Sequence, residues 1–180
     1  QAVSRGLGDV YKRQHYRVLQ SIRDARRRFN INSDRVFLSG HGTGADACFD
    51  IGLSHPDVFA GVIPIAGQID NFAKKTWRRN GSYLPWYIIG GQLDRDKFER
   101  NAPTLNSMML RGDDIILGEY VGRGYESFYS EIHKLFAWME LHERQAFPRE
   151  IDVTTLRPNN NRYYWLKSHT IPHVLSLIHI

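Results

Sequence analysis

The segment from Val36 to Ala45 constrains the fold of this chain more than any other part of its sequence. It reads VFLSGHGTGA, the pattern of a buried strand that turns sharply into a helix. Such a turn follows the pattern small-x-apex-x-small, because the apex is strained and backbone packs against the residues two before and two after it. Gly40 and Gly44 fill the two small positions, so Gly42 is the apex.

The two other registers of this turn are excluded by side-chain size. A Thr43 apex would place His41 at the first small position. A Ser39 apex would place Phe37 and His41 at the two small positions. The apex is therefore glycine, which has no side chain to attack a carbonyl, and an acyl-enzyme mechanism cannot start from it.

The rest of the chain alternates helical and extended patterns. Helices are predicted near 15–30, 44–54, 96–110 and 126–144, strands near 35–40, 61–67, 85–91 and 115–122, and a loop-rich stretch at 68–84. The strands are apolar on both faces, which is typical of a parallel sheet covered by helices on both sides. We therefore predict an α/β fold with a doubly wound parallel sheet of about four strands.

Two helices carry apolar stripes that we expect to face the core. Asp96 is expected to cap the first of them, and periodic spacing marks the second. The stripes consist of Phe98, Leu105 and Met109, and of Phe128, Ile132, Leu135, Phe136 and Met139.

The two ends of the chain differ in character from its middle. Residues 1–14 and 176–180 resemble translated sequencing-adapter sequence from metagenomic assemblies, and we expect them to be extraneous. Residues 15–145 would then form the α/β domain. Residues 146–175 predict a hairpin or the first strands of a β-rich segment.

Charge and composition exclude several classes of function. The net charge of +5 becomes +3 without residues 1–14, because 21 basic and 18 acidic residues remain. The basic cluster Arg23, Arg26, Arg27 and Arg28 lies on an amphipathic helix and is expected to be a solvated face, so we predict no nucleic-acid partner. No apolar stretch approaches the length of a membrane span. A single cysteine excludes an internal disulfide framework.

Four motifs occur in an order that resembles a known family. They are Asp34–His41 (DRVFLSGH), Ser54–Gly61 (SHPDVFAG), Gly90–Asp94 (GGQLD) and Gly122–Glu126 (GRGYE). Together they are similar to the later half of the catalytic domain in the α/β-hydrolase superfamily, nearest to its prolyl oligopeptidase and secreted-esterase branch. The resemblance implies that earlier strands, one oxyanion donor and any signal peptide lie outside this sequence. A secreted or periplasmic location would suit that branch, but the compartment and the oligomeric state are left unassigned.

The resemblance also assigns the positions of a Ser-His-Asp triad. The nucleophile position is Gly42, the acid position is Asp94, and the histidine position is Tyr125. The backbone N–H of Thr43 would be one oxyanion donor. A phenol is a poor general base near neutral pH, so two of the three positions depart from the pattern.

These departures imply a pseudoenzyme that binds a small ester- or peptide-like ligand or a partner. An active hydrolase of esters or peptides that uses non-standard residues is the alternative. A third reading makes the β-rich C-terminal segment the active module, as a surface or scaffolding element that the α/β domain supports.

The remaining polar residues are expected to be structural. Without an Asp94–histidine pair, Asp94 is a turn or helix-start residue, and His41 is expected to pack against neighbouring strands. His55 and His133 form no i, i+4 pair, so we predict no metal site and no cofactor. Cys48 is expected to behave as a small buried hydrophobe.

Two further clusters have competing interpretations. Asp46 and Asp50 share one helix face and could form a paired-carboxylate site, but solvated or salt-bridged acids are the favoured reading. An aromatic and basic cluster in 68–86 either walls a ligand pocket or covers the sheet edge. It comprises Trp77, Arg78, Arg79, Tyr83 and Trp86. We also expect an uncovered apolar strand edge near 35–40.

Overall fold

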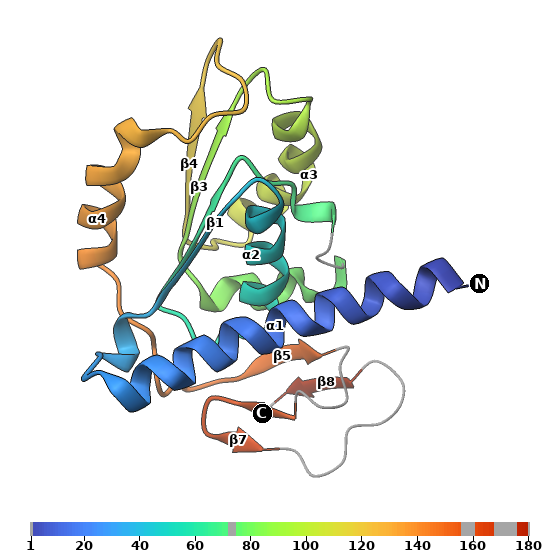
Figure 1. Ribbon diagram of the computed structural model, residues 1–180. Coiled ribbons are helices and arrows are strands. Elements are labelled where there is room, and N and C mark those ends of the chain that lie inside the picture. Colours follow the sequence, from blue (N-terminus) through green and yellow to red (C-terminus); the bar gives the residue numbers. More distant parts are fainter. Residues whose placement is uncertain (1, 72–74, 156–160, 168–175, 180) are drawn as a thin grey trace. The chain divides into compact units, whose positions relative to one another are not determined.

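The computed structural model describes residues 2–71, 75–155, 161–167 and 176–179, which belong to two units (Figure 1). The units are Gln1–Ser33 and Asp34–Ile180. Among the helices that the structure describes, none combines the length and apolar character that a membrane span requires.

The first unit contains one long helix, α1 (Ala2–Arg28). The helix begins well before the predicted start near residue 15, and no proline interrupts the sequence between the two points. Arg23, Arg26, Arg27 and Arg28 form a largely solvated face, as predicted. The last three lie in the final turn, where cations interact favourably with the helix dipole. Whether residues 1–14 are extraneous stays a prediction.

The second unit is built on a four-stranded parallel sheet, which confirms the predicted fold class. Its strands are β1 (Phe37–His41), β2 (Gly61–Ile65), β3 (Trp86–Gly91) and β4 (Ile115–Tyr120). Their order in the sheet is their order in the chain. Within the described residues, β1 therefore forms one edge, as predicted, and β4 forms the other.

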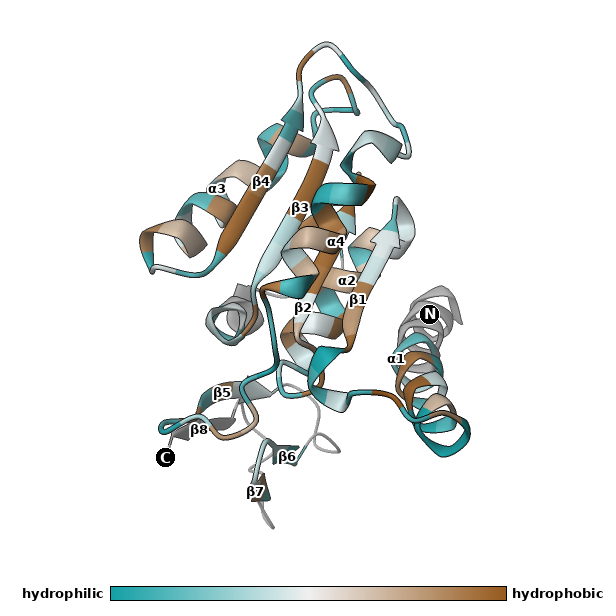
Figure 2. Cartoon of the chain, turned by 90° about the vertical axis from the view of Figure 1, so that its left-hand side faces the viewer, coloured by the Kyte–Doolittle hydropathy of each residue, from teal (hydrophilic) through white to brown (hydrophobic). Residues whose placement is uncertain are grey.

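Helices cover both faces of this sheet. On one face lie α2 (Thr43–Ser54) and α3 (Lys97–Leu110), and on the other lies α4 (Ile132–Glu140) (Figure 1). Figure 2 looks onto the face that α4 covers. Trp86 stacks on Phe49 of α2 with ring centroids 5.7 Å apart, whereas its neighbour Tyr87 points to the other face and meets Trp138 of α4 edge-on. This alternation explains why every residue of β3 is buried.

The last helix is shorter than the predicted 126–144, and its inward face is shifted. A 3₁₀ turn, η4 (Tyr129–Glu131), precedes it, and Phe128 before that turn has a positive φ of 48°. Leu135, Trp138 and Met139 face the core at three- and four-residue spacing. Ile132 and Phe136 are 44% and 60% exposed, so their predicted place in the core is wrong. Met109 of α3 is likewise exposed, because the buried face of that helix runs through Thr104, Leu105 and Met108.

A buried carboxylate connects η4 to the sheet. Glu131 accepts hydrogen bonds from Tyr87 Oη at 2.7 Å, from Tyr120 Oη at 2.5 Å and from Lys134 Nζ at 2.8 Å. Burial alone raises the pKa of Glu131, but the three donors outweigh burial and leave the pKa below the usual range of a glutamate. The ionised form of Glu131 therefore stabilises the fold.

Four short strands make up the β-rich segment near the C-terminus. They are β5 (Asp152–Thr155), β6 (Arg162–Tyr163), β7 (Leu166–Lys167) and β8 (Ser176–His179). β6 and β7 form an antiparallel hairpin, and β5 pairs antiparallel with β8. The predicted β-rich segment is thus present, and its pairing reaches into 176–180. Whether 176–180 is extraneous stays a prediction.

The loop-rich stretch at 68–84 contains two short 3₁₀ helices and holds the β-rich segment to the domain. These helices are η2 (Ile69–Asn71) and η3 (Lys75–Tyr83). Another 3₁₀ helix, η1 (Ser33–Arg35), lies outside this stretch and precedes β1. The buried Asn80 of η3 exchanges hydrogen bonds of 2.9 Å with the backbone N–H and carbonyl of Thr154. Its Nδ2 also donates to the Leu53 carbonyl at 2.8 Å. One amide thus joins α2, η3 and β5.

Candidate functional site

Gly42 lies at the turn between β1 and α2, where the sequence predicts the apex. Its φ of 57° and ψ of −120° are strained for any residue with a side chain, and its N–H donates to the Ile65 carbonyl at 2.9 Å. A Cβ on Gly40 would overlap the backbone carbonyl of Gly44, so the small residue before the apex is required. Within the described residues nothing approaches a Cβ on Gly44, so the second small position is not required by contacts there.

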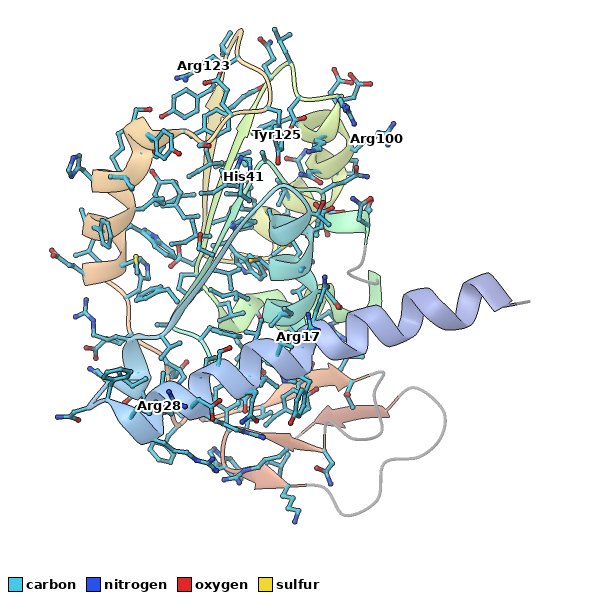
Figure 3. The ribbon with its side chains drawn as sticks, viewed as in Figure 1. Arg17, Arg28, His41, Arg100, Arg123 and Tyr125 are labelled. Carbon is cyan, nitrogen blue, oxygen red and sulfur yellow. The ribbon has the colours of Figure 1, made fainter. Side chains whose placement is uncertain are left out.

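Tyr125 covers the apex from the loop after β4. A Cβ on Gly42 would overlap Tyr125 Oη, so the phenol fills the space in which a nucleophilic side chain would begin. The same Oη lies 3.0 Å from His41 Nδ1, and the two rings are 4.6 Å apart (Figure 3). The hydroxyl at residue 125 therefore occupies the nucleophile position that the residue at 42 leaves empty.

The second ring nitrogen of His41 fixes the direction of this hydrogen bond. His41 Nε2 lies 2.8 Å from the backbone carbonyl of Glu126, which can only accept. In the neutral ring the proton is therefore on Nε2, and Nδ1 accepts from Tyr125 Oη–H. The sequence predicts that His41 packs against neighbouring strands, but it gives no sign that both of its ring nitrogens contact the loop that carries Tyr125.

Asp94 follows β3, as predicted, and is only 4% exposed. Its Oδ2 accepts from Lys97 Nζ at 3.0 Å, and the same ammonium donates to the Ala66 carbonyl at 2.9 Å. Lys97 Nζ also lies 5.1 Å from the centre of the Tyr125 ring, a cation–π distance. Within the described residues no hydrogen bond joins Asp94 to Tyr125, so the acid is neutralised by a lysine instead of orienting a base.

The turn between β3 and α3 is strained at two successive residues. Arg95 and Asp96 have positive φ values of 48° and 55°. Asp96 precedes α3 but its side chain makes no capping hydrogen bond, so the predicted cap is wrong. The left-handed backbone at Asp96 departs from the extended conformation that a capping residue normally has.

A cavity of about 400 Å³ lies over the apex. The charges of two carboxylates and two cationic side chains balance in its wall. The wall also includes Thr43, whose N–H lies in the first turn of α2 and has no intrahelical acceptor. The cavity thus brings together all four predicted site residues. Its lining is Gly42, Thr43, Asp46, Asn71, Asp94, Arg95, Lys97 and Tyr125.

The other candidate residues do not form a second reactive centre. Asp46 is buried and accepts from Gln68 N at 2.6 Å and from Asn71 Nδ2 at 2.7 Å, so it is a structural acceptor and not the solvated acid expected. Asp50 is also buried and does not line the cavity. Burial, and then the neighbouring Asp46, raises the pKa of Cys48 to about 12, which makes this thiol the inert hydrophobe predicted.

In the described part of the chain, neither His55 nor His133 lines the cavity over the apex. His55 is half-buried in the link after α2 and its backbone N–H closes that helix, whereas His133 is exposed on α4. Within the ranges described, no group of three or more His, Cys, Asp or Glu side chains could hold a metal ion.

The aromatic and basic cluster near η3 does not wall the cavity over the apex. Trp86 is a core residue whose Nε1 donates to the Gly81 carbonyl at 3.0 Å. Arg79 and Tyr83 line a separate hollow of about 320 Å³ near the amino ends of β3 and β4. Of the two readings, a wall of the cavity over the apex is therefore wrong for these three residues, and the side chains of Trp77 and Arg78 lie outside the described residues.

Comparisons with known proteins identify the fold. No protein-family model and no curated protein matches this sequence. Among solved structures, a variant of SOBER1 from Arabidopsis thaliana matches with a TM-score of 0.58 and 19% identity over 74% of this chain and 63% of that chain. Esterase PE8 matches with a TM-score of 0.60 and 20% identity over 73% and 61%. S-formylglutathione hydrolase (FrmB) from Staphylococcus aureus matches with a TM-score of 0.57 and 14% identity over 72% and 62%.

The similarity to these structures concerns the fold. The chain spans about three-fifths of the length of these three structures. It has the parallel sheet and flanking helices of the α/β-hydrolase fold, and two of the three structures are described as an esterase and a hydrolase. The nearer placement in the prolyl oligopeptidase branch stays a prediction.

Proposed function

We propose that this chain is a non-catalytic α/β-hydrolase homologue, a pseudoenzyme that binds a small ester- or peptide-like ligand in the cavity over Gly42. The observation that carries this proposal is the position of Tyr125 Oη in the space that a Cβ on Gly42 would need. A side chain at position 42 would overlap Tyr125 in its present position, so a serine at 42 cannot act as the nucleophile while Tyr125 stays there.

At each of the three triad positions this chain has either a different residue or a different hydrogen-bond partner. Residue 42 has no side chain, a phenol stands at 125, and Asp94 is paired with Lys97. Loss of the triad from a working serine hydrolase reduces turnover by about a millionfold. Hydrolysis of an ester by the serine route should therefore be undetectable.

The cavity itself supports ligand binding. Its volume of about 400 Å³ lies within the range of pockets that hold small molecules. The N–H of Thr43, at the amino end of α2, can donate a hydrogen bond to a carbonyl oxygen of the ligand. Because Asp46 and Asp94 balance Arg95 and Lys97 in the wall, an uncharged ester or amide suits the site better than an ion.

One observation favours the alternative, an active hydrolase with non-standard residues. The Oη of Tyr125 donates to His41 at 3.0 Å, so the site does hold a hydroxyl next to a base. The third reading, in which the β-rich segment is the active module, has no such observation in its favour.

Ester hydrolysis and fluorophosphonate labelling test the proposal. The wild type, Gly42→Ser, Tyr125→His and the double variant are compared, with the labelled residue located by peptide mapping. We expect no steady-state turnover by the wild type, and labelling at position 42 in the double variant alone, because Gly42→Ser by itself must displace Tyr125 and has no histidine at position 125. Gly112→Ser is the matched control, since Gly112 has a positive φ of 83° and open space around it.

Sustained ester turnover by the wild type, well above the rate of hydrolysis in buffer and retained by Gly112→Ser, would refute the non-catalytic reading. Labelling of the Gly42→Ser single variant as strong as that of the double variant would show that Tyr125 does not block the apex.

A further inference from the structure

We infer that Tyr125 is an acyl acceptor: its phenol, with His41 as general base, takes an acyl group from an activated ester bound in the cavity over Gly42. This inference rests on the proposed ligand site and names the chemistry that the site can still perform. It assigns a nucleophile to residue 125 in place of the missing one at residue 42.

The hydrogen bonds around Tyr125 have the order of a nucleophile, a base and an orienting group. Oη–H donates to His41 Nδ1 at 3.0 Å, and His41 Nε2–H donates to the Glu126 carbonyl at 2.8 Å. The backbone carbonyl keeps Nδ1 free to accept a proton, which is the role that a third group has in serine triads. Lys97 Nζ, 5.1 Å from the ring centre, stabilises the negative charge that develops on the phenol oxygen.

The position of Tyr125 makes the hydroxyl available to a ligand. The side chain is 57% exposed, and both Tyr125 and Gly42, against which Oη lies, line the cavity, so we expect a carbonyl carbon bound there to reach Oη. Oη lies at the apex, beside the first turn of α2, where the Thr43 N–H can donate to the carbonyl oxygen of that ligand.

The acyl transfer balances without any further reactant. Tyr125 Oη attacks the carbonyl carbon while its proton passes to His41 Nδ1, and a new oxygen–carbon bond forms. The tetrahedral intermediate collapses with cleavage of the bond to the leaving alcohol, which takes the proton from His41. The products are an ester of Tyr125 and the free alcohol, and His41 is neutral again.

The same geometry predicts that the ester on Tyr125 accumulates. Acylation removes the hydrogen that Oη donates to His41, and among the contacts of the described residues the exposed side chain then keeps its ring contacts with Lys97 and with the His41 ring, but no hydrogen bond to a base. The acyl group therefore moves away from the base that would activate a water. A serine, by contrast, is fixed to the apex itself.

Stopped-flow measurement of p-nitrophenol release from p-nitrophenyl acetate, with peptide mass spectrometry, tests this inference on the full chain. We expect a burst of about one p-nitrophenol per chain, with the acetyl group on Tyr125 at a rate about a hundredfold above that of Tyr129. Tyr129 is 77% exposed and serves as an internal reference within each sample. Tyr125→Phe should abolish the burst, and Tyr129→Phe should leave it unchanged.

The role of His41 has its own measurement. His41→Ala should reduce acetylation of Tyr125 to the rate of Tyr129, and added imidazole should restore part of the difference. Unfolding would also make the two rates equal, so the circular dichroism of His41→Ala must match that of the wild type, and the recovery with imidazole, which needs the folded site, reports the base. Equal acetylation of Tyr125 and Tyr129 in the wild type, or a burst that survives Tyr125→Phe, would overturn the inference.

Binding of p-nitroacetanilide, an unreactive amide of similar shape, separates this inference from the proposed function. Binding at the cavity without acetylation of Tyr125 would refute the acyl transfer and leave the ligand site standing. The absence of both would refute the ligand site as well. Turnover that depends on Tyr125 would support the acyl transfer and refute the non-catalytic reading.

Discussion

Replacement of Gly42 by alanine should destabilise the protein by an amount that depends on residue 125. The new methyl group has two effects: it forces a side chain onto a backbone with φ 57° and ψ −120°, and it overlaps Tyr125 Oη. Since Tyr125 is 57% exposed, we expect its ring to swing out toward solvent while the turn keeps its shape.

The two effects can be given separate magnitudes. The strained backbone costs about 1–3 kcal/mol. Displacement of the ring costs the hydrogen bond to His41, about 0.5–1.5 kcal/mol, and the cation–π contact with Lys97, about 0.5–1 kcal/mol. Gly42→Ala should therefore lower the free energy of unfolding by about 2–5 kcal/mol in the wild type.

Urea unfolding of a double-mutant cycle isolates the second effect. In Tyr125→Phe the overlapping oxygen is gone and the nearest ring carbon lies 3.2 Å from the new methyl group, so Gly42→Ala should cost only the backbone strain. The expected coupling energy is about 1–2 kcal/mol. Gly112→Ala, at another positive φ with open space, should be additive with Tyr125→Phe. Additive free energies for Gly42→Ala and Tyr125→Phe would refute the overlap on which the proposed function depends.

Three further predictions concern the fold around the site. Because the pKa of Glu131 is lowered in the folded protein, its carboxylate stabilises the fold above the usual glutamate pKa, and this stabilisation is lost as pH falls through the folded pKa. Glu131→Gln should therefore lower the free energy of unfolding at neutral pH. In urea unfolding, the variant's free energy should fall less steeply than that of the wild type between about pH 6 and 3. With its pKa raised to about 12, Cys48 should resist a disulfide reagent at pH 8 in the native protein and react at once in urea. Asn80→Ala should cost about 2–4 kcal/mol in urea unfolding, because it leaves buried backbone groups of β5 and α2 without partners, whereas Asn106→Ala on the exposed face of α3 should cost far less.

The sheet and its apex could be predicted because their signals are local. Gly40 and Gly42 stand at fixed spacing after an apolar run, and the collision of a Cβ on Gly40 with the Gly44 carbonyl is the physical reason for that spacing. The strands β2 and β3 are continuous apolar runs because helices cover both of their faces.

The wrong predictions concern residues whose conformation depends on distant contacts. Phe128 was expected inside a helix, but its ring packs on Tyr120 of β4 at 4.9 Å and its backbone takes a positive φ. The helix therefore starts later, and its inward face changes phase. The sequence alone offers no local signal for such a tertiary contact.

The central contact of the site was equally beyond local reasoning. His41 and Tyr125 are 84 residues apart and meet only when β1 and the loop after β4 come together at the carboxyl end of the sheet. A usable signal did exist in the combination of a glycine at 42 with a bulky residue at 125. That combination becomes informative only once the two positions are known to be neighbours.

The overlap between positions 42 and 125 also sets the order in which sequences of this kind can change. A serine that arises first at 42 meets the phenol oxygen and weakens the fold, whereas a histidine that arises first at 125 meets only the open backbone of a glycine. A side chain at position 42 is therefore tolerated best when Tyr125 has been replaced first. Homologous sequences should accordingly pair a side chain at 42 with a residue other than tyrosine at 125, and glycine at 42 with either.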